Sequence, residues 1–248
     1  VVKRVYGKDV GVQTNIVRQS PEIAQGVDTG GAGDQGIMIG YACNDNSDLV
    51  PQEYYLARKL AQKIYRKYPY DGKTQVTITD DGKVRAVASF CCTPSEDLEN
   101  ICNEFFSNAN IKVEALLVNP AGYWSLGGFD ADAGLTGRKL AVDNYGPRVP
   151  LGGGAFSGKD ATKVDRSAAY MARAIAVEYL RRYKAEEVLV RLAYAIGYSQ
   201  PLEATAIIDG VPREIEGYDL SPKGIIEFLD LKKPIYSQTA EWGHMGNN

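Results

Sequence analysis

Apolar and polar positions form two successive patterns of the same kind along the chain. In the first, an apolar run is followed by residues at helical spacing, where Leu56, Leu60, Ile64 and Tyr68 share one stripe. Two alternating runs then flank the turn Asp80-Asp81-Gly82, which is typical of a hairpin. The pattern predicts the order β-α-β-β-α-β: a strand over 36–42, a helix over 51–68, strands over 73–79 and 83–89, a helix over 95–106 and a strand over 113–118.

The second pattern repeats this order from residue 139 onward. Thr162-Lys-Val-Asp165 resembles a capping box with Asp in place of Glu, and it precedes a long helix. The inward stripe of that helix is Ala168, Met171, Ala172, Ile175, Tyr179 and Tyr183. The expected elements are a strand over 139–145, a helix over 165–184, strands over 188–196 and 203–209, a helix over 221–229 and a closing strand of undetermined position. Two such units predict an α+β fold, each sheet covered by helices on one face.

Charge is distributed unevenly over the 248 residues. The net charge of −3 argues against a general nucleic-acid binder. Residues 138–191 hold 11 Lys/Arg against 6 Asp/Glu, a surplus of five, so the remainder carries −8. A basic region in an acidic protein favours a small anionic ligand over a long polyanion. The alternative is a solvated helix face, which we prefer for Arg173, Arg181 and Arg182.

Composition also bears on the cellular compartment. The chain contains no apolar run of about 18 residues, which argues against a membrane span, and its first residues have no apolar signal-peptide core. The four cysteines, Cys43, Cys91, Cys92 and Cys102, lack metal-ligand spacing. We therefore expect a cytoplasmic protein with reduced, mostly buried thiols.

The stretch Gly152-Gly-Gly-Ala-Phe-Ser-Gly-Lys159 carries the most chemical information. Glycines let backbone N–H groups approach phosphate oxygens, and the following helix N-terminus adds partial positive charge. Gly153, Gly158 and Lys159 have Walker A spacing, but Asp160 replaces the Ser/Thr that would hold Mg²⁺. The sequence therefore disfavours a P-loop NTPase and favours another kind of polyphosphate site with a metal.

Two further motifs make the interpretation specific. They are Gly31-Ala-Gly-Asp-Gln-Gly36 and Gly134-Leu-Thr-Gly-Arg138-Lys139. With the stretch above, they resemble the S-adenosylmethionine synthetase (methionine adenosyltransferase) family from about Val12 to about Gly246. That family has three α+β units around a pseudo-threefold axis. The resemblance implies that residues 1–34 hold the end of the first unit, with a strand around 10–17, and an active-site loop. The central unit then covers 35–127 and the C-terminal unit 128–248.

The resemblance also implies a reaction. The methionine sulfur attacks C5′ of ATP, and the released triphosphate is hydrolysed to phosphate and diphosphate. A thioether has no proton to remove, so the first step needs no general base. It needs positioned cations and a metal ion to stabilise the departing triphosphate. The implied metal ions are Mg²⁺ and K⁺.

Site residues follow from the same resemblance, position by position. The catalytic cations are Lys73, Arg138, Lys139, Lys159 and Lys163. ATP-binding residues are Asp71, Lys73, Tyr123, Trp124, Asp132, Arg138, Lys139, Ala155 and Lys159. Methionine-binding residues are Asp132, Lys163 and Ile196, with Asp28 near the substrates and Asp165 as the Mg²⁺ ligand.

Each of these residues also has a simpler interpretation. Spacing alone makes Lys73 a solvated residue and an Arg-Lys pair such as Arg138-Lys139 an ordinary surface pair. Asp165 could equally be a helix N-cap, a role compatible with metal ligation. The remaining alternatives are turn positions for Asp28 and Asp132 and a core strand position for Ile196.

The chain departs from the family pattern at three places. Gly122-Tyr123-Trp124 replaces the usual Gly-Arg-Phe, which leaves Trp124 to stack on adenine without the arginine. Gly127-Gly-Phe-Asp-Ala-Asp132 replaces a Gly-Gly-Pro pattern. The family's Gly-His-Pro-Asp-Lys motif, with a catalytic histidine and a metal-binding aspartate, has no match, and the only histidine is His244.

Three hypotheses accommodate these departures. The first is the large subunit of a split enzyme: a homodimer of this chain, completed by two copies of a small subunit with the missing motif. The second is a non-catalytic, nucleotide-binding or regulatory homologue, which the retained phosphate ligands disfavour. The third is a shortened piece of an ordinary enzyme, which Val1 in place of Met permits. A neighbouring reading frame with Gly-His-Pro-Asp-Lys would distinguish them.

Overall fold

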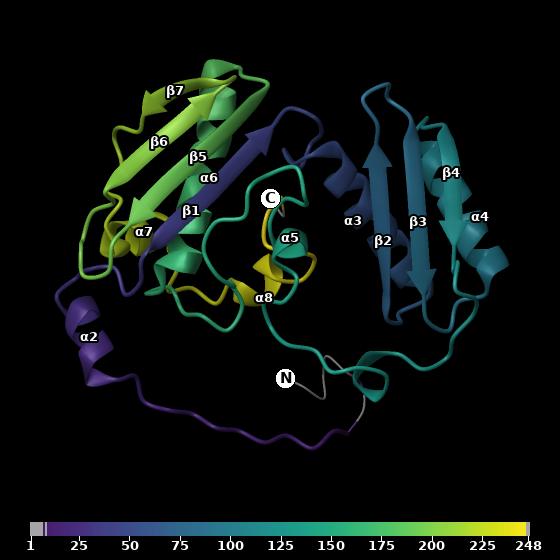
Figure 1. Ribbon diagram of the computed structural model, residues 1–248, viewed down its shortest axis with the longest axis horizontal. Helices are drawn as coiled ribbons and strands as arrows, with labels where there is room; N and C mark the ends of the chain where they lie inside the picture. Colours follow the sequence, from purple (N-terminus) through teal and green to yellow (C-terminus); the bar gives the residue numbers. More distant parts are fainter. Residues whose placement is uncertain (1–6, 8, 247–248) are drawn as a thin grey trace.

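The chain folds into two β-sheets, each covered by helices, as the computed structural model of residue 7 and residues 9–246 shows (Figure 1). The first sheet has the order β1-β5-β6-β7 and is antiparallel throughout. In the second, β2-β3-β4, the β3–β4 pair is parallel. The strands are β1 (Gly36–Cys43), β2 (Gly72–Ile78), β3 (Val84–Phe90), β4 (Val113–Val118), β5 (Glu187–Tyr194), β6 (Glu203–Ile208) and β7 (Val211–Glu214). The α+β fold class is confirmed.

The three longest helices cover the sheets. Helices α3 (Gln52–Lys67) and α4 (Ser95–Asn108) pack on the β2-β3-β4 sheet, and α6 (Val164–Tyr183) packs on β1 and β5. The shorter helices are α2 (Pro21–Asp28), η1 (Gly128–Asp130), α5 (Leu140–Asp143), α7 (Pro222–Phe228) and α8 (Tyr236–Thr239). Helix α3 buries Leu56, Leu60 and Ile64, as its stripe predicted.

Helix α6 lies unusually close to β1. A Cβ placed at Gly40 would lie 2.0 Å from the carbonyl carbon of Ala172, so only glycine allows this approach. A short turn joins α6 to β5, and β5 is antiparallel to β1. Helix α6 and β1 therefore run in the same direction, and their N-terminal ends lie at the same end of the sheet. Because Gly31–Gly36 leads into β1 and Gly152–Lys159 into α6, this geometry brings two motifs to one place.

Strand 36–42 was predicted correctly as a strand but belongs to the other unit's sheet. It pairs with β5 over its whole length, while α3 leaves it to cover β2-β3-β4. Met38 to Cys43 are all buried, so the strand needs cover on both faces. Residues adjacent in sequence do not supply that cover, and α6 does on one face.

Two other element predictions were wrong, and one strand was missed. Residues 140–143 form helix α5 instead of a strand, because Val142 and Asp143 both donate to the Lys139 carbonyl at 3.0 Å. Residues 9–19 contain no strand, and Ile16 is 89% exposed. The short edge strand β7 was missed because Pro212 lies within it, and proline is tolerated only at such edges.

Two predictions for α6 also need correction. Arg173 is buried instead of solvated, and it donates to the carbonyls of Tyr41, Asp48 and Leu49. Tyr183, predicted to point inward, is 43% exposed. Arg181 and Arg182 are exposed, as expected.

Two further expectations concern the cysteines and membrane-spanning helices. All four cysteines are free, and Cys43, Cys91 and Cys102 are buried, as predicted. None of the described helices has the length and apolar character needed to cross a bilayer.

Candidate functional site

The Gly152–Lys159 loop folds around Asp165 in the first turn of α6. The Gly154 N–H donates to Asp165 Oδ1 at 3.0 Å, and Lys159 Nζ lies 2.6 Å from Asp165 Oδ2. The Asp165 side chain is 9% exposed and that of Lys159 is 31% exposed. A Cβ at Gly153 would lie 2.6 Å from Asp165 Oδ1, so glycine is required for the loop to wrap the carboxylate. The result is a cation–carboxylate pair at the positive end of a 20-residue helix.

Asp165 is not the N-cap of α6. That position belongs to Lys163, whose side chain makes no capping bond, and the expected capping box does not form. The carboxylate instead faces the glycine loop, where it is suited to a cation. No group of three or more His, Cys, Asp or Glu that could hold a metal occurs among the residues with described positions. A metal ion at Asp165 would therefore complete its coordination with ligand oxygens and water, as Mg²⁺ usually does.

The Gly134–Lys139 loop packs directly on this loop. Gly137 has φ +79°, and a Cβ placed there would lie 2.2 Å from the Cβ of Ala155. The contact places the backbone just before Arg138 against the candidate nucleotide contact Ala155. Within residues 9–246, the side chains of Arg138 and Lys139 make no hydrogen bond or ion pair, and both are exposed. Both cations are thus available to an anionic ligand.

The Gly31–Gly36 motif is bonded to the loop that carries Ile196. Ala32 N–H donates to Tyr198 O, and Gly197 N–H donates to Ala32 O, both at 2.8 Å. Ile196 lies beyond the end of β5 and is 52% exposed, so the alternative of a core strand residue is wrong. An adjoining cavity of about 350 Å³ is lined by Val27, Gly30, Gly31, Thr162 and residues of α7 and the loop after it.

The two remaining polar positions of this region lie at its edges. Asp28 ends α2 and is exposed, and Lys163 Nζ lies 3.3 Å from Gln19 Oε1. Asp160 Oδ1 accepts hydrogen bonds from the Thr162 backbone and hydroxyl groups at 2.8 and 2.5 Å. Burial raises the pKa of Asp160, but these bonds outweigh it and hold the pKa below its usual value. Asp160 therefore shapes the turn before α6.

A second group of predicted site residues surrounds the start of β2. Asp71 Oδ2 accepts from Gly128 N–H at 3.1 Å, and Asp132 N–H donates to Gly128 O at 3.1 Å. Trp124 O accepts from Cys92 N–H at 2.9 Å, which fixes the segment after Tyr123. Lys73 pairs with Ser89 in the β2–β3 ladder and is exposed.

The structure does not bring the two groups into contact. No hydrogen bond or ion pair between described residues links Lys73 or Trp124 to the Gly152–Lys159 loop. Lys159, Asp165, Ala155 and the Arg138 backbone thus form one cluster, whereas Asp71, Trp124 and Asp132 form another.

Sequence reasoning missed His244. Its Nε2 lies 3.0 Å from Ser157 Oγ and its Nδ1 lies 2.6 Å from the Tyr170 hydroxyl. Burial and the nearby Arg166 guanidinium lower the pKa of His244 to about 4. Ser157 is 87 positions away in sequence, so no local spacing connects the two. The only available signal was a single histidine between Gly243 and Gly246.

Comparisons with known proteins agree with the motifs. The family model described as "S-adenosylmethionine synthetase, central domain" matches residues 29–123, and "S-adenosylmethionine synthetase, C-terminal domain" matches residues 126–248. An S-adenosylmethionine synthase of Pelagibacter ubique (strain HTCC1062) is 40% identical over 276 aligned positions. That alignment covers 95% of this chain and 70% of the relative.

Proposed function

Because this chain belongs to the S-adenosylmethionine synthetase family, we propose that it is a methionine adenosyltransferase, acting on ATP, L-methionine and water. The observation that carries the proposal is the meeting of two glycine loops at the N-terminus of α6. There Lys159 and Asp165 form a 2.6 Å pair, and Gly137 packs on Ala155. Backbone N–H groups, mobile cations and a helix N-terminus suit a triphosphate.

The proposed reaction places few demands on proton transfer. The methionine sulfur forms a bond to C5′, the C5′–O bond breaks, and its electron pair stays on the triphosphate. The sulfur becomes a sulfonium without losing a proton. Lys159, Arg138 and Lys139 would stabilise the charge on the leaving group, which is the main electrostatic requirement. Subsequent hydrolysis of the triphosphate yields phosphate and diphosphate.

In this proposal Lys159 pairs either with Asp165 or with a phosphate oxygen of the substrate. In the structure its ammonium pairs with Asp165 at 2.6 Å. When Mg²⁺ and triphosphate are bound, Asp165 would hold the metal ion and Lys159 would turn to a phosphate oxygen. Mg²⁺ supplies charge neutralisation of the triphosphate, and K⁺ is the second metal ion we propose.

We assign the other predicted residues to adenine, the phosphates and methionine. Trp124 would stack on adenine, with Tyr123 and Asp71 nearby, and Lys73 would reach the phosphates. Asp132 would hold the methionine ammonium, and Lys163, Ile196 and Asp28 would surround methionine. The two clusters of the chain are then joined by ATP itself or across a subunit interface.

We propose that assembly completes the site. Along β5, Val188, Val190 and Leu192 are buried under α6, whereas Leu189 and Ala193 on the opposite face stay partly exposed. This face is covered at β1 but partly exposed along β5, and the part along β5 is the surface we assign to a homodimer of the chain. The Gly-His-Pro-Asp-Lys motif would come from first-unit polypeptide outside these residues, which we propose to be a separate small subunit.

The test is formation of S-adenosylmethionine by the purified chain, alone and mixed with a first-unit polypeptide, with ATP, methionine, Mg²⁺ and K⁺. We expect turnover only in the mixture, and light scattering should detect a dimer of the chain. Full turnover by the chain alone would exclude the small subunit. Absence of turnover in a mixture that forms a stable complex would favour the non-catalytic homologue.

A further inference from the structure

The segment Gly243–Gly246 is buried although it lies near the end of the chain. The His244 N–H donates to Asp143 O at 2.9 Å, at the end of α5. A Cβ at Gly243 would lie 2.8 Å from Val142 O, so this backbone packs closely on α5. Helix α5 begins directly after Lys139. The segment therefore supports the element that follows Arg138 and Lys139.

The His244 ring supports the other glycine loop. It contacts Ser157 Oγ and the Tyr170 hydroxyl at 3.0 and 2.6 Å. Arg166 Nε donates to the same hydroxyl at 3.1 Å, and Arg166 Nη1 donates to Lys159 O at 2.9 Å. A continuous chain of hydrogen bonds thus runs from His244 through Tyr170 and Arg166 to the Lys159 backbone.

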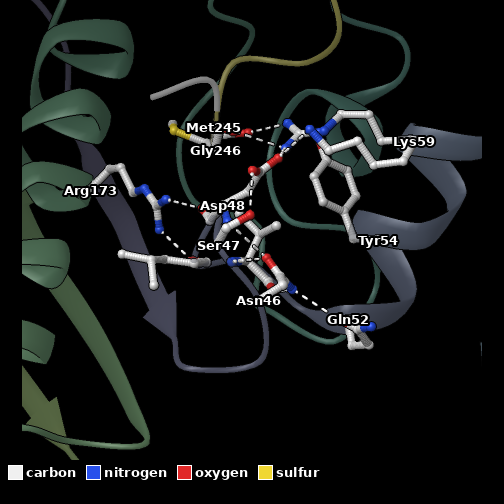
Figure 2. A network of polar contacts seen from close by, with 12 residues as sticks. Asn46, Ser47, Asp48, Gln52, Tyr54, Lys59, Arg173, Met245 and Gly246 are labelled. Atoms are coloured by element: carbon white, nitrogen blue, oxygen red, sulfur yellow. Dashed lines mark hydrogen bonds and ion pairs between the residues drawn. The ribbon is translucent and has the colours of Figure 1, made fainter. Parts of the chain in front are cut away.

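The backbone of Met245 and Gly246 is held by the Arg58 side chain (Figure 2). Arg58 of α3 donates to Met245 O at 2.5 Å and to Gly246 O at 3.0 Å, and it pairs with Asp48 at 2.8 Å. Lys59 also pairs with Asp48. Arg173 of α6 binds the Asp48 carbonyl, as Figure 2 shows. The loop after β1, α3, α6 and the C-terminal segment are therefore tied together.

His244 is suited to this position because it stays neutral. Burial and Arg166 lower its pKa to about 4, so near neutral pH one ring nitrogen donates and the other accepts. The ionisable side chains around it are Arg166 and Tyr170 of α6, and Asp143 lies at its backbone. Burial raises the pKa values of Tyr170 and Asp143 above their usual values. A neutral ring can bridge two hydroxyl groups without adding a second buried cation beside Arg166.

We propose that His244 is a positioning residue that sets the Phe156–Lys159 backbone through Ser157 and Tyr170, and holds α5 through its backbone N–H. This inference rests on the proposed function, because its consequence is the placement of Lys159 and Arg138 against a triphosphate. Misplacement of a catalytic group by about 1 Å can cost about 10²-fold in rate. His244 acts without touching the substrate.

Two substitutions separate the two ring contacts. The amide of His244→Gln reaches the place of Nε2 and can still bind Ser157, whereas that of His244→Asn reaches only the place of Nδ1 and Tyr170. We expect His244→Asn to lower kcat about tenfold or more, within the range that misplacement allows. His244→Gln should stay within about threefold of wild type, because the Ser157 contact remains and the Tyr170 hydroxyl keeps its bond from Arg166 Nε.

Ser157→Ala completes the design. If Ser157 and His244 act through one contact, the Ser157→Ala/His244→Asn double variant should be no slower than the slower single variant. Cys102→Ala, a buried change in α4, is the control for stability: it should lower the thermal midpoint without changing kcat. All variants are assayed in the enzyme completed with first-unit polypeptide.

The outcomes distinguish the two proposals. Activity of wild type with a slow His244→Asn, a near-normal His244→Gln and a non-additive double variant supports positioning. Wild-type kcat in His244→Asn would overturn the inference and leave the proposed function intact. Equal loss in the Asn and Gln variants, in proportion to their thermal midpoints, would also overturn it, because the role would be structural. An inactive wild type would refute the proposed function itself.

Discussion

Replacing Lys159 with alanine tests its electrostatic role in turnover, with its contribution to folding measured alongside. The Lys159 side chain is 31% exposed, but that of Asp165 is only 9% exposed, so removing the ammonium from this carboxylate should cost roughly 1–3 kcal/mol of stability. Asp165 keeps the Gly154 hydrogen bond when the ammonium is removed. We therefore expect the thermal midpoint to fall by up to about 12 °C.

Turnover measured well below the thermal midpoint should still fall, because folded enzyme then predominates and the loss reports on the barrier. Loss of one positioned stabilising group costs about 10²–10³ in kcat, or roughly 3–4 kcal/mol of barrier. The assay is S-adenosylmethionine formation by the completed enzyme at saturating ATP and methionine. The thermal midpoint is recorded on the same samples by circular dichroism.

Lys63→Ala provides a matched control. Its ammonium lies 2.7 Å from Glu104, and its side chain is 30% exposed, so geometry and exposure nearly equal those of Lys159. It lies on α3, away from the glycine loops. Glu104 is 63% exposed whereas Asp165 is 9% exposed, so Lys63→Ala should cost less stability, and only Lys159→Ala should lose turnover. Wild-type kcat in Lys159→Ala would mean that the basic cluster is a solvated surface, and the reasoning would be refuted.

Three further changes test the structure around the site. Arg173→Leu leaves three carbonyls without their donor and should lower the free energy of unfolding by at least about 3 kcal/mol in urea denaturation, whereas Arg181→Leu on the exposed face should change it little. The free energy of unfolding should fall by up to about 3 kcal/mol as pH falls from about 6.5 to about 4. In this range His244 binds a proton in the unfolded chain but not in the folded chain, where its pKa is about 4. His244→Gln should remove this part of the pH dependence. Gly137→Ala should separate the two glycine loops and raise KM for ATP. Gly82→Ala, at a position with similar φ but open space around it, should lower stability only. Equal KM values in the two variants would contradict the packing of Gly137 on Ala155.

Local patterns sufficed for most of the fold. The stripe of α3 and the hairpin turn at Gly82 depend on spacing within a few residues, and both elements were placed to within about two residues. Sheet membership depended on long-range packing. Strand β1 pairs with β5, about 150 positions away in sequence, and Gly40 lets α6 pack closely on this pair. No local feature of the sequence specifies β5 as the partner of β1.

The site was predictable where glycine motifs carry it. Gly137 and Gly153 make contacts that a side chain would disturb, and these motifs had drawn attention to Arg138, Lys159 and Asp165. Arg173 and His244 were misjudged or missed for a physical reason. Their functions lie in hydrogen bonds to backbone or to residues distant in sequence, and composition alone does not distinguish a buried, satisfied arginine from a solvated one.

Binding of inorganic tripolyphosphate with Mg²⁺ to the 248-residue chain tests most directly whether this chain holds the triphosphate site. The measurement is isothermal titration calorimetry on wild type, Arg138→Ala and Lys159→Ala. We expect saturable binding of one tripolyphosphate per chain that weakens with added salt, and a clear loss of affinity in each variant. Equal affinity in all three proteins, or no binding by a folded wild-type chain, would contradict the assignment of the two glycine loops as the triphosphate site.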